Sequence, residues 1–384
     1  MPPALSDAGL TQDQRMMVET VREFARTELL PMDRKLDESE ASLGEILPRL
    51  AEMGLLNLCV PEELNGLGLP CRVYAAILHE IAMWSPSMAV TISVHSMVGN
   101  SLRKYATDAL RSDPLCQWGE ASQLGAFCLT EAGAGSDAKA TKTAAVAVDG
   151  GYRITGEKLW ITNGLCARWF LTLTRLANAP DDQSLCAFLI DGNEPGITRT
   201  KVHGKMGLRA SETAVIHLND VFVPKEHLIG QHGEGLQVFL ASLNEGRIGI
   251  AAQSTGIAEA CLNEMVSYAR QREQFGQPIG KFQAIAEMIA QSAVELEASK
   301  ALTRRAARWV DAGKPDRVFS SMAKLYASES ANRIAYRAVQ VHGGAGYVNE
   351  CRVEQLYRDA RVTTIYEGTS EIQRIVIARG LGGR

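Results

Sequence analysis

One glutamate near the C-terminal end of the chain has the neighbours of a general base. Glu367 follows the apolar pair Ile365-Tyr366 and precedes Gly368-Thr369-Ser370, a sequence typical of a helix start. Burial beside apolar side chains raises the pKa of a carboxyl toward the range in which general bases work. A glutamate that is solvated in a loop is the simpler interpretation, and it is the one that these residues alone favour.

A glycine-rich segment in the middle of the chain has the composition of an anion-binding loop. The segment from Phe127 to Asp137 holds two glycines, two acidic residues and two hydroxyl side chains. Backbone N–H groups in such a loop can bind an anion. An ordinary glycine turn after a strand explains the same residues.

Two further segments are unusual as plain structure. In Lys158–Gly164, Trp160 and Thr162 could cover and hydrogen-bond a flat heteroaromatic ring, although packing of the tryptophan in the core is favoured by the residues alone. In the segment from Gln340 to Tyr347, three glycines occupy four positions, which exceeds what a helix cap requires. They indicate a close backbone approach to a pyrophosphate or to another subunit.

Several classes of site are excluded by spacing. The chain has no G-x-G-x-x-G between a strand and a helix, so a Rossmann site is not expected. Gly151–Lys158 resembles a phosphate loop, but its lysine is one place late and the stretch is typical of a strand. The seven histidines are scattered and no H-E-x-x-H occurs, so no metal site is predicted.

Charge and cysteine usage limit the partners and the compartment. Forty Lys and Arg against 44 Asp and Glu leave a net charge of -4, which predicts neither nucleic acid nor a membrane surface as a partner. The eight cysteines show no CxxC spacing, and several lie in apolar runs typical of buried, reduced thiols. With no targeting pattern and no long apolar run, the cytoplasm is the expected compartment.

The periodicity changes twice along the 384 residues. Helical spacing predicts buried helices at 73–84 and 88–105, with an end or kink at Pro31. Short apolar runs from 125 to 223 predict an antiparallel β module, with a hairpin at Asp149-Gly150-Gly151. Helical spacing then returns, with long helices at 282–310 and 315–341 and another that begins near Leu243. We therefore predict an α+β chain of three domains, 1–124, 125–232 and 233–384.

Together and in this order, these segments resemble the acyl-CoA dehydrogenase family of FAD-dependent flavoproteins. The motifs are L-T-E-x-G-x-G-S-D, W-I-T-N, R-x-x-F-G at Arg272, H-G-G-x-G-Y and I-Y-E-G-T-S-E-I-Q-R, and the likeness runs from about residue 10 to about residue 380. The segments Asn244–Ala251 and Tyr366–Glu371 make the short-chain, butyryl-type branch the nearest. The resemblance implies an N-terminal helical domain, a central antiparallel β-barrel or sandwich, and a C-terminal domain like a four-helix bundle.

The resemblance also implies roles for individual residues. The expected FAD contacts within one chain are Phe127, Leu129, Thr130, Gly135, Ser136, Trp160, Ile161 and Thr162, with Thr369 and Glu371 near the adenosine half. The expected contacts to the FAD of a neighbouring subunit are Arg272, Phe275, Gln283, Gln340, Val341, Gly343 and Gly344. The expected substrate contacts are Ser136, Asn244, Arg247 and Gly368. A homotetramer of two dimers and electron-transferring flavoprotein as electron acceptor are implied as well.

By the same resemblance, Glu367 is the catalytic base. It removes the α-proton of an acyl-CoA, the backbone N–H of Glu367 and a ribityl hydroxyl stabilise the enolate, and the β-hydrogen leaves as hydride to flavin N5, giving a trans-2-enoyl-CoA. One branch of the family carries its base at the position of Gly246, which has no side chain to serve. The adjacent Glu245 is expected to point elsewhere, because neighbours on a helix diverge by about 100°.

Two residues depart from the pattern of the family, so the identity of the acyl group and its carrier is not predicted. Asn244 stands where many relatives have Asp, and His95 stands where short-chain relatives have Asn, although His95 is expected to be a packing residue. An oxygen-reactive oxidase or monooxygenase, a dehydrogenase linked to acyl carrier protein, and a catalytically silent FAD or acyl-thioester binding subunit are the alternative functions. Chain length, branching and carrier are not predicted.

Overall fold

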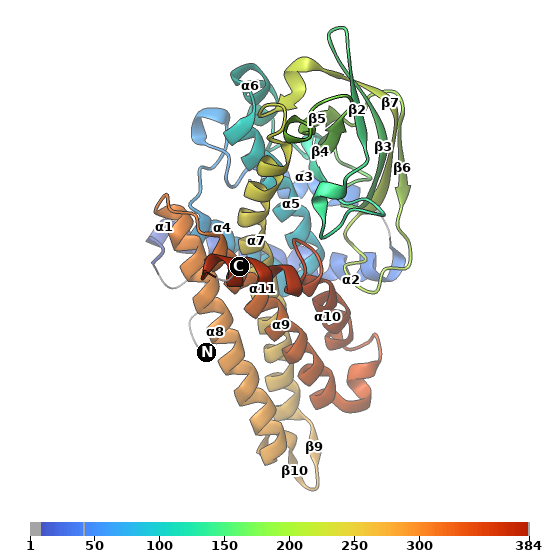
Figure 1. The fold of residues 1–384 in the computed structure, drawn as a ribbon. Helices are drawn as coiled ribbons and strands as arrows, with labels where there is room; N and C mark the ends of the chain where they lie inside the picture. Colours follow the sequence, from blue (N-terminus) through green and yellow to red (C-terminus); the bar gives the residue numbers. More distant parts are fainter. Residues whose placement is uncertain (1–8, 41–42, 383–384) are drawn as a thin grey trace.

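The computed structural model describes residues 9–40 and 43–382. N-terminal helices, a sheet and long C-terminal helices follow one another, in the predicted order (Figure 1). The N-terminal helices are α1 (Gln12–Phe24), α2 (Leu30–Ser39), α3 (Leu47–Glu52), α4 (Cys71–Trp84), α5 (Pro86–Tyr105) and α6 (Asp108–Cys116). A π-helical segment, Ala25–Leu29, joins α1 to α2, and Pro31 lies in the first turn of α2, where proline is tolerated.

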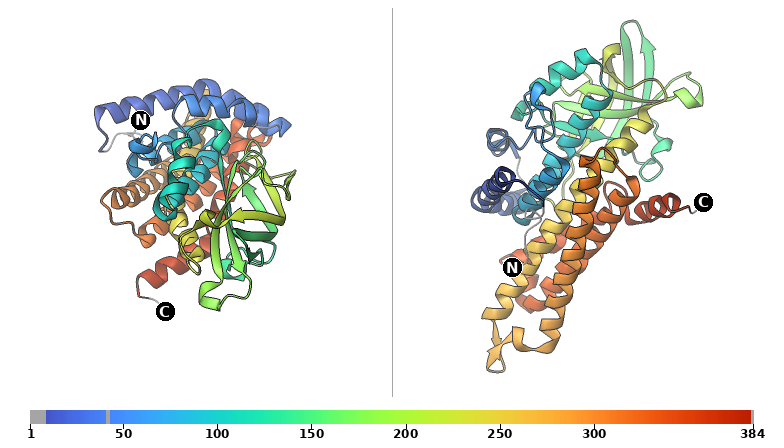
Figure 2. Two further views of the ribbon diagram at one scale, coloured as in Figure 1. Left: turned by 90° about the horizontal axis from the view of Figure 1, so that it is seen from above. Right: turned by 90° about the vertical axis from the view of Figure 1, so that its left-hand side faces the viewer.

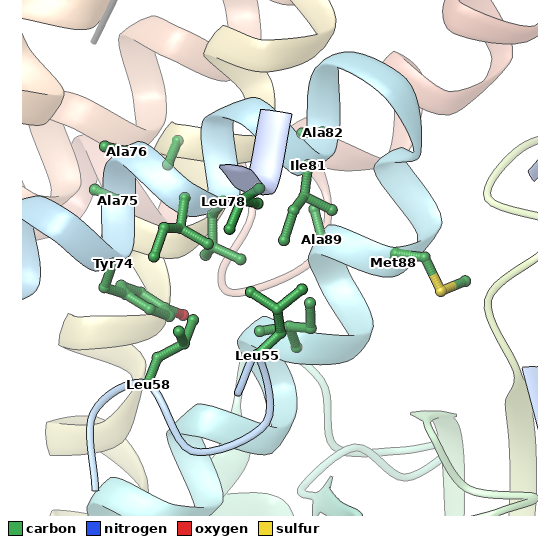
Figure 3. Packing of buried hydrophobic residues seen from close by; sticks show 14 of the residues in the cluster. Leu55, Leu58, Tyr74, Ala75, Ala76, Leu78, Ile81, Ala82, Met88 and Ala89 are labelled. Carbon is green, nitrogen blue, oxygen red and sulfur yellow. The ribbon is translucent and has the colours of Figure 1, made fainter. Parts of the chain in front are cut away.

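Helices α4 and α5 form the centre of the N-terminal core, as their apolar sequences predict. Ser85 separates them and caps α5, because its side chain accepts a hydrogen bond from the Met88 N–H at 3.2 Å. Leu78, Ile81 and Ala89 are fully buried in this core (Figure 3). Both helices also pack on the first long C-terminal helix, so the core fixes that helix in place.

The central strands form one sheet. They are β1 (Gly125–Cys128), β2 (Ala144–Val148), β3 (Gly151–Thr162), β4 (Trp169–Leu176), β5 (Leu185–Asp191), β6 (Ile197–Lys201), β7 (Thr213–Pro224) and β8 (Leu228–Ile229). The strand order is β6-β7-β3-β2-β4-β5-β8, with β1 also paired to β4. The predicted hairpin joins β2 to β3, with Val148 opposite Gly151.

The sheet is not wholly antiparallel, and that detail of the prediction is wrong. β4 runs parallel to both β1 and β2. Parallel neighbours need a long connection between them. Here the β2–β3 hairpin lies in the connection from β1 to β4, so the chain returns to β4 in the same direction without an intervening α-helix.

The C-terminal helices comprise three long helices that extend away from the sheet as rods (Figure 2) and two short ones. They are α7 (Gly235–Gln271), α8 (Gln283–Asp311), α9 (Arg317–His342), α10 (Arg352–Arg361) and α11 (Ser370–Gly380), with a small hairpin, β9 (Glu273–Gln274) and β10 (Gln277–Pro278), at the far end. Helix α9 packs against each of the other four, so it is the central helix of this group. None of the helices within the described ranges is long and apolar enough to cross a membrane.

Helix α7 begins at Gly235, not near Leu243 as the sequence predicts. Glycines at 233 and 235 argue against a helix start there, because glycine has a low helix propensity. Gly235 instead serves a close contact, since a Cβ there would lie 2.5 Å from the backbone carbon of Cys186 on β5. The start of α7 is thereby held against the sheet.

Candidate active site

Glu367 lies at the turn that leads into α11, beside α7. Its φ is +54° and that of Gly368 is +89°, so two successive residues are left-handed. A Cβ on Gly246 of α7 would lie 2.6 Å from Glu367 Oε2, so the absence of a side chain at 246 makes room for the carboxylate. Oε2 is enclosed and has no hydrogen-bond partner among the described residues. The alternative of a solvated loop glutamate is therefore wrong.

The surroundings of Glu367 give its carboxyl the pKa of a useful base. Burial raises the pKa of Glu367 to about 7, and the positive charges of Arg247 and Lys324 limit the rise. Both cations are themselves buried. The pKa of the Lys324 ammonium falls to about 8, chiefly because burial disfavours its charge, although the charge of Glu367 opposes this shift.

The neighbours of Gly246 on α7 point in different directions. Glu245 pairs with Lys104 of α5 and not with the Glu367 loop, as the helical geometry predicts. Arg247 is buried and its Nη1 donates to the side-chain oxygen of Asn244 at 2.8 Å. The Nε of Arg247 has no partner among the described residues, so one buried donor beside Glu367 remains available to a ligand.

A buried ion pair fixes the glycine-rich loop that follows β1. Lys158 of β3 is fully buried, and its Nζ donates to Glu131 at 2.7 Å and to the carbonyl oxygen of Leu129 at 3.2 Å. Glu131 also accepts hydrogen bonds from Thr141, from both the N–H and the hydroxyl of Thr143, and from the N–H of Lys142. Burial alone would raise the pKa of Glu131, but these donors lower it to about 2.

The same network joins the loop to the Trp160 segment. The Leu159 N–H donates to the carbonyl oxygen of Thr130 at 2.8 Å, so the segments that carry Leu129, Thr130, Trp160 and Thr162 lie side by side. Gly135 and Ser136 are exposed in this loop. Ile161 is buried in the sheet core, so only its backbone faces away from the core. Phe127 lies against Phe239 of α7 at a ring distance of 4.5 Å.

Trp160 is not a core residue, contrary to the interpretation that its sequence favours. Its side chain is 63% exposed and its φ is +60°. The pairing of β3 with β7 shifts register between Lys158 and Ile161, and this bulge turns the indole out of the sheet. An exposed indole beside a glycine-rich loop is suited to cover a flat ring.

The residues expected to reach a neighbour's cofactor lie elsewhere. Arg272 and Phe275 belong to the β9–β10 hairpin at the far end of α7, and Gln283 begins α8 (Figure 1). Phe275 is 93% exposed, and Gln340, Gly343 and Gly344 are exposed at the end of α9. Val341 is buried, so its side chain packs in the helical core.

The remaining predicted residues have local roles that the structure shows. The Thr369 hydroxyl caps α11 by accepting the Ile372 N–H, and Glu371 is exposed in the first turn. His95 is a packing residue, as predicted, since its ring stacks on Trp118 at 4.4 Å. The ring accepts the Gly125 N–H and contacts the Trp118 carbonyl oxygen at 3.1 Å, and burial lowers its pKa to about 4.

Sequence inspection missed Glu131, Lys158, Lys324 and Gln373. Buried lysines have no distinctive pattern in a sequence, because their partners lie far along the chain. Within the described ranges, no group of three or more His, Cys, Asp or Glu side chains is arranged to hold a metal ion.

Three family models match consecutive parts of the chain. The acyl-CoA dehydrogenase N-terminal domain matches residues 11–146, the middle domain 126–221 and the C-terminal domain 233–382. The mitochondrial short-chain specific acyl-CoA dehydrogenase of Rattus norvegicus is 40% identical over 370 residues, which cover 96% of this chain and 90% of the rat protein.

Two solved structures extend the comparison to the fold. Butyryl-CoA dehydrogenase from Megasphaera elsdenii superposes with a TM-score of 0.94 at 34% identity, covering 98% of this chain and 99% of that one. A chain from a structural study of the electron transferring flavoprotein of Acidaminococcus fermentans has a TM-score of 0.95 at 36% identity, with the same coverage.

Proposed function

The chain belongs to the acyl-CoA dehydrogenase family, and from that premise we propose that Glu367 is its catalytic base and that its substrates are short-chain acyl-CoA thioesters. The protein is an FAD-dependent acyl-CoA dehydrogenase. The observation that carries the assignment of the base is the enclosed, unpartnered carboxylate oxygen of Glu367 beside Gly246. The relatives do not favour an oxidase, a carrier-protein-linked enzyme or a silent binding subunit.

The residues around the glycine-rich loop fit a flavin. Trp160 presents an exposed indole, and a Cβ on Gly133 or Gly135 would meet no atom within 4 Å, so backbone is open to a ligand there. We propose that Phe127, Leu129, Thr130, Gly135, Ser136, Trp160, Ile161, Thr162, Thr369 and Glu371 hold FAD within one chain. When bound there, FAD supplies the acceptor for the hydride from the substrate β-carbon.

Glu367 takes the α-proton in this proposal. The α-proton of a thioester is too weakly acidic for a free carboxylate to remove at neutral pH, so the site must stabilise the enolate as its charge develops. The Glu367 N–H has no acceptor among the described residues, which supports its assignment as a donor to the thioester oxygen. Arg247, Asn244, Ser136 and Gly368 are proposed to position the acyl-CoA.

A buried apolar cluster packs against Tyr366, the residue before Glu367, and we propose that it borders the acyl group. Val90, Val94 and Ile250 are buried together, with Tyr366 packed against them. The Tyr366 hydroxyl donates to Gln253, whose amide donates to the carbonyl oxygen of Pro86 at 2.7 Å, so α5, α7 and the base segment are joined at this point. Relatives from several species are named short-chain specific.

Anaerobic titration with a panel of acyl-CoAs tests the substrate class. Following the bleaching of the flavin band, we expect butyryl-CoA to reduce the flavin fastest and long-chain acyl-CoAs to reduce it at least about tenfold more slowly. Equal rates across the panel would contradict the short-chain assignment while leaving the base assignment intact. Rapid consumption of oxygen during turnover would instead support an oxidase.

The pH dependence of turnover follows from the raised pKa of Glu367. A base must be deprotonated to accept the α-proton, so activity is lost as pH falls through the pKa of about 7. We expect kcat/KM to fall about tenfold per pH unit below that point and to be level above it. Initial rates with a fixed acyl-CoA from about pH 5.5 to about pH 8.5 measure this. A flat profile across the whole range would argue against Glu367.

We propose a homotetramer built from two dimers. Arg272, Phe275, Gln283, Gln340, Val341, Gly343 and Gly344 lie away from the loop of their own chain, and the proposal gives them contacts to a neighbour's FAD. Analytical ultracentrifugation is expected to show a tetramer, and Phe275→Ala is expected to lower FAD retention without unfolding the chain. A monomer in solution that keeps full flavin occupancy and activity would contradict the proposed tetramer.

We also propose an electron acceptor, a compartment and domain boundaries for the protein. The Acidaminococcus comparison supports electron-transferring flavoprotein as the electron acceptor. All eight cysteines are free, which supports a reducing compartment and thus the cytoplasm. We propose that the domains are 1–124, 125–232 and 233–384; residues 1–8, 41–42 and 383–384 lie outside the described part.

A further inference from the structure

Two buried donors converge on the backbone that carries Glu367. Lys324 Nζ, from α9, and Gln373 Nε2, from α11, each donate to the carbonyl oxygen of Gly368 at 2.8 Å. Gln373 Nε2 also lies 3.1 Å from the carbonyl oxygen of Glu367 and donates to it. Both side chains are fully buried. We call Lys324 and Gln373 the two-donor clamp.

The clamp holds a backbone conformation that an ordinary chain avoids. A glutamate with a φ of +54° followed by a glycine at +89° persists only where the surroundings fix it. The clamp fixes the carbonyl groups of both residues. The carboxylate itself lies against Gly246 of α7. Helices α7, α9 and α11 together therefore determine where Glu367 Oε2 lies.

Lys324 is buried where a lysine is costly, and its hydrogen bond goes to a carbonyl oxygen and not to a carboxylate. The charged groups that act on it are Glu367, Arg247 of α7, Glu329 of α9 and Glu371 of α11. Arg247 and Lys324 act on Glu367 from α7 and α9, and Tyr366 lies beside it on its own segment. Lys324 therefore supplies both a hydrogen bond and a positive charge, whereas Gln373 supplies hydrogen bonds alone.

Resting on the proposed role of Glu367, we propose that Lys324 and Gln373 are positioning residues that hold the catalytic carboxylate against the substrate α-carbon. They act through Glu367 and contact neither the thioester nor the reacting atoms. The two side chains differ in what their loss does to Glu367. Loss of either donor misplaces the base, and loss of Lys324 alone also changes the charge that the base experiences.

The test compares Lys324→Met with Gln373→Met in single-turnover flavin reduction by butyryl-CoA across a pH series. Because a small misplacement of reacting groups can cost about 10²-fold, we expect both variants to lower the limiting rate by about 10-fold to 10²-fold with little change in the apparent Kd for butyryl-CoA. Only Lys324→Met is expected to move the midpoint of the pH profile upward, because removal of a positive charge disfavours the glutamate anion. FAD content and thermal unfolding are measured alongside.

Lys300→Met is the matched control. Lys300 of α8 is equally buried and lies 2.6 Å from Glu259, away from the base. Lys300→Met is expected to lower thermal stability while keeping the wild-type rate and pH midpoint.

A wild-type rate and midpoint in both clamp variants overturn the proposal, as does a midpoint shift in Lys300→Met equal to that of Lys324→Met. If Lys324→Met does not fold, the rate of Gln373→Met decides. A Glu367→Gln variant that reduces flavin at the wild-type rate overturns the base assignment and the clamp with it, which distinguishes the two failures.

Discussion

Replacing Glu367 with glutamine is expected to slow anaerobic flavin reduction by butyryl-CoA by at least about 10²-fold to 10⁴-fold. The amide keeps the shape of the carboxylate and still fits beside Gly246, but it cannot accept the α-proton. FAD content and the affinity for acyl-CoA should change little, since the flavin loop and the α7 segment are untouched. Stopped-flow absorbance of the flavin band measures the rate, and equilibrium titration measures the affinity.

The control for this variant is Glu245→Gln. Glu245 is adjacent in sequence to the alternative base position, but it pairs with Lys104 and faces away from the Glu367 turn. It should therefore retain most activity. If Glu367→Gln reduces flavin at the wild-type rate while Glu245→Gln does not, the assigned carboxylate is the wrong one. Equal loss in both variants would indicate that α7 positions the substrate more directly than the geometry suggests.

The second large effect is expected from Glu131→Gln. Removal of one partner of a buried ion pair leaves the other charge uncompensated, and such changes cost about 3–5 kcal/mol of unfolding free energy. Lys158, fully buried, would lose its carboxylate partner, and the loop from Leu129 to Ser136 would lose its anchor on β3. We expect a loss of about 3 kcal/mol in urea unfolding together with loss of FAD on purification.

Glu157→Gln is the matched control for that loss. Glu157 lies one residue before Lys158 on the same strand and pairs with His217 at 3.0 Å, but both side chains are nearly half exposed. Exposed ion pairs contribute at most about 1 kcal/mol. Glu157→Gln should therefore keep both the stability and the flavin. A Glu131→Gln protein with unchanged stability and full FAD would show that the ion pair does not support the loop.

The stability of the Glu131 anchor should also depend on pH. Its pKa is about 2 in the folded chain and near 4.3 in an unfolded one, so its contribution is complete above the unfolded value. That contribution is lost as pH falls from about 4.3 toward about 2. Retention of FAD is expected to weaken over the same window.

The elements that the sequence predicts well are those whose own residues determine them. Helices α4 and α5 are apolar on most sides and had to be buried, and the Asp149-Gly150-Gly151 turn determines the β2–β3 register. The neighbours of Glu367 raised a desolvated carboxyl only as an alternative to a solvated loop glutamate, and the structure decides for the enclosed carboxyl. Each of these inferences depends on residues within a few positions of one another.

The features that the sequence did not predict depend on contacts between distant segments. The parallel pairing of β1 and β2 with β4 is a property of the strand order, which alternation of apolar residues does not encode. Trp160 is exposed only because the β3–β7 register shifts beside it. The Nζ of Lys158 and that of Lys324 bond to residues 27 and 44 positions away, and in the sequence both resemble ordinary surface lysines.

The most direct test of the account follows the hydrogens of the substrate itself. Wild-type protein is mixed anaerobically with butyryl-CoA that carries two deuterons on the α-carbon, and flavin absorbance and product mass are recorded. We predict that the flavin is bleached and that the product is trans-2-butenoyl-CoA with one α-deuteron remaining, because Glu367 removes the other. A protein that contains FAD but is not bleached by butyryl-CoA, or a product that keeps both α-deuterons, would contradict the account.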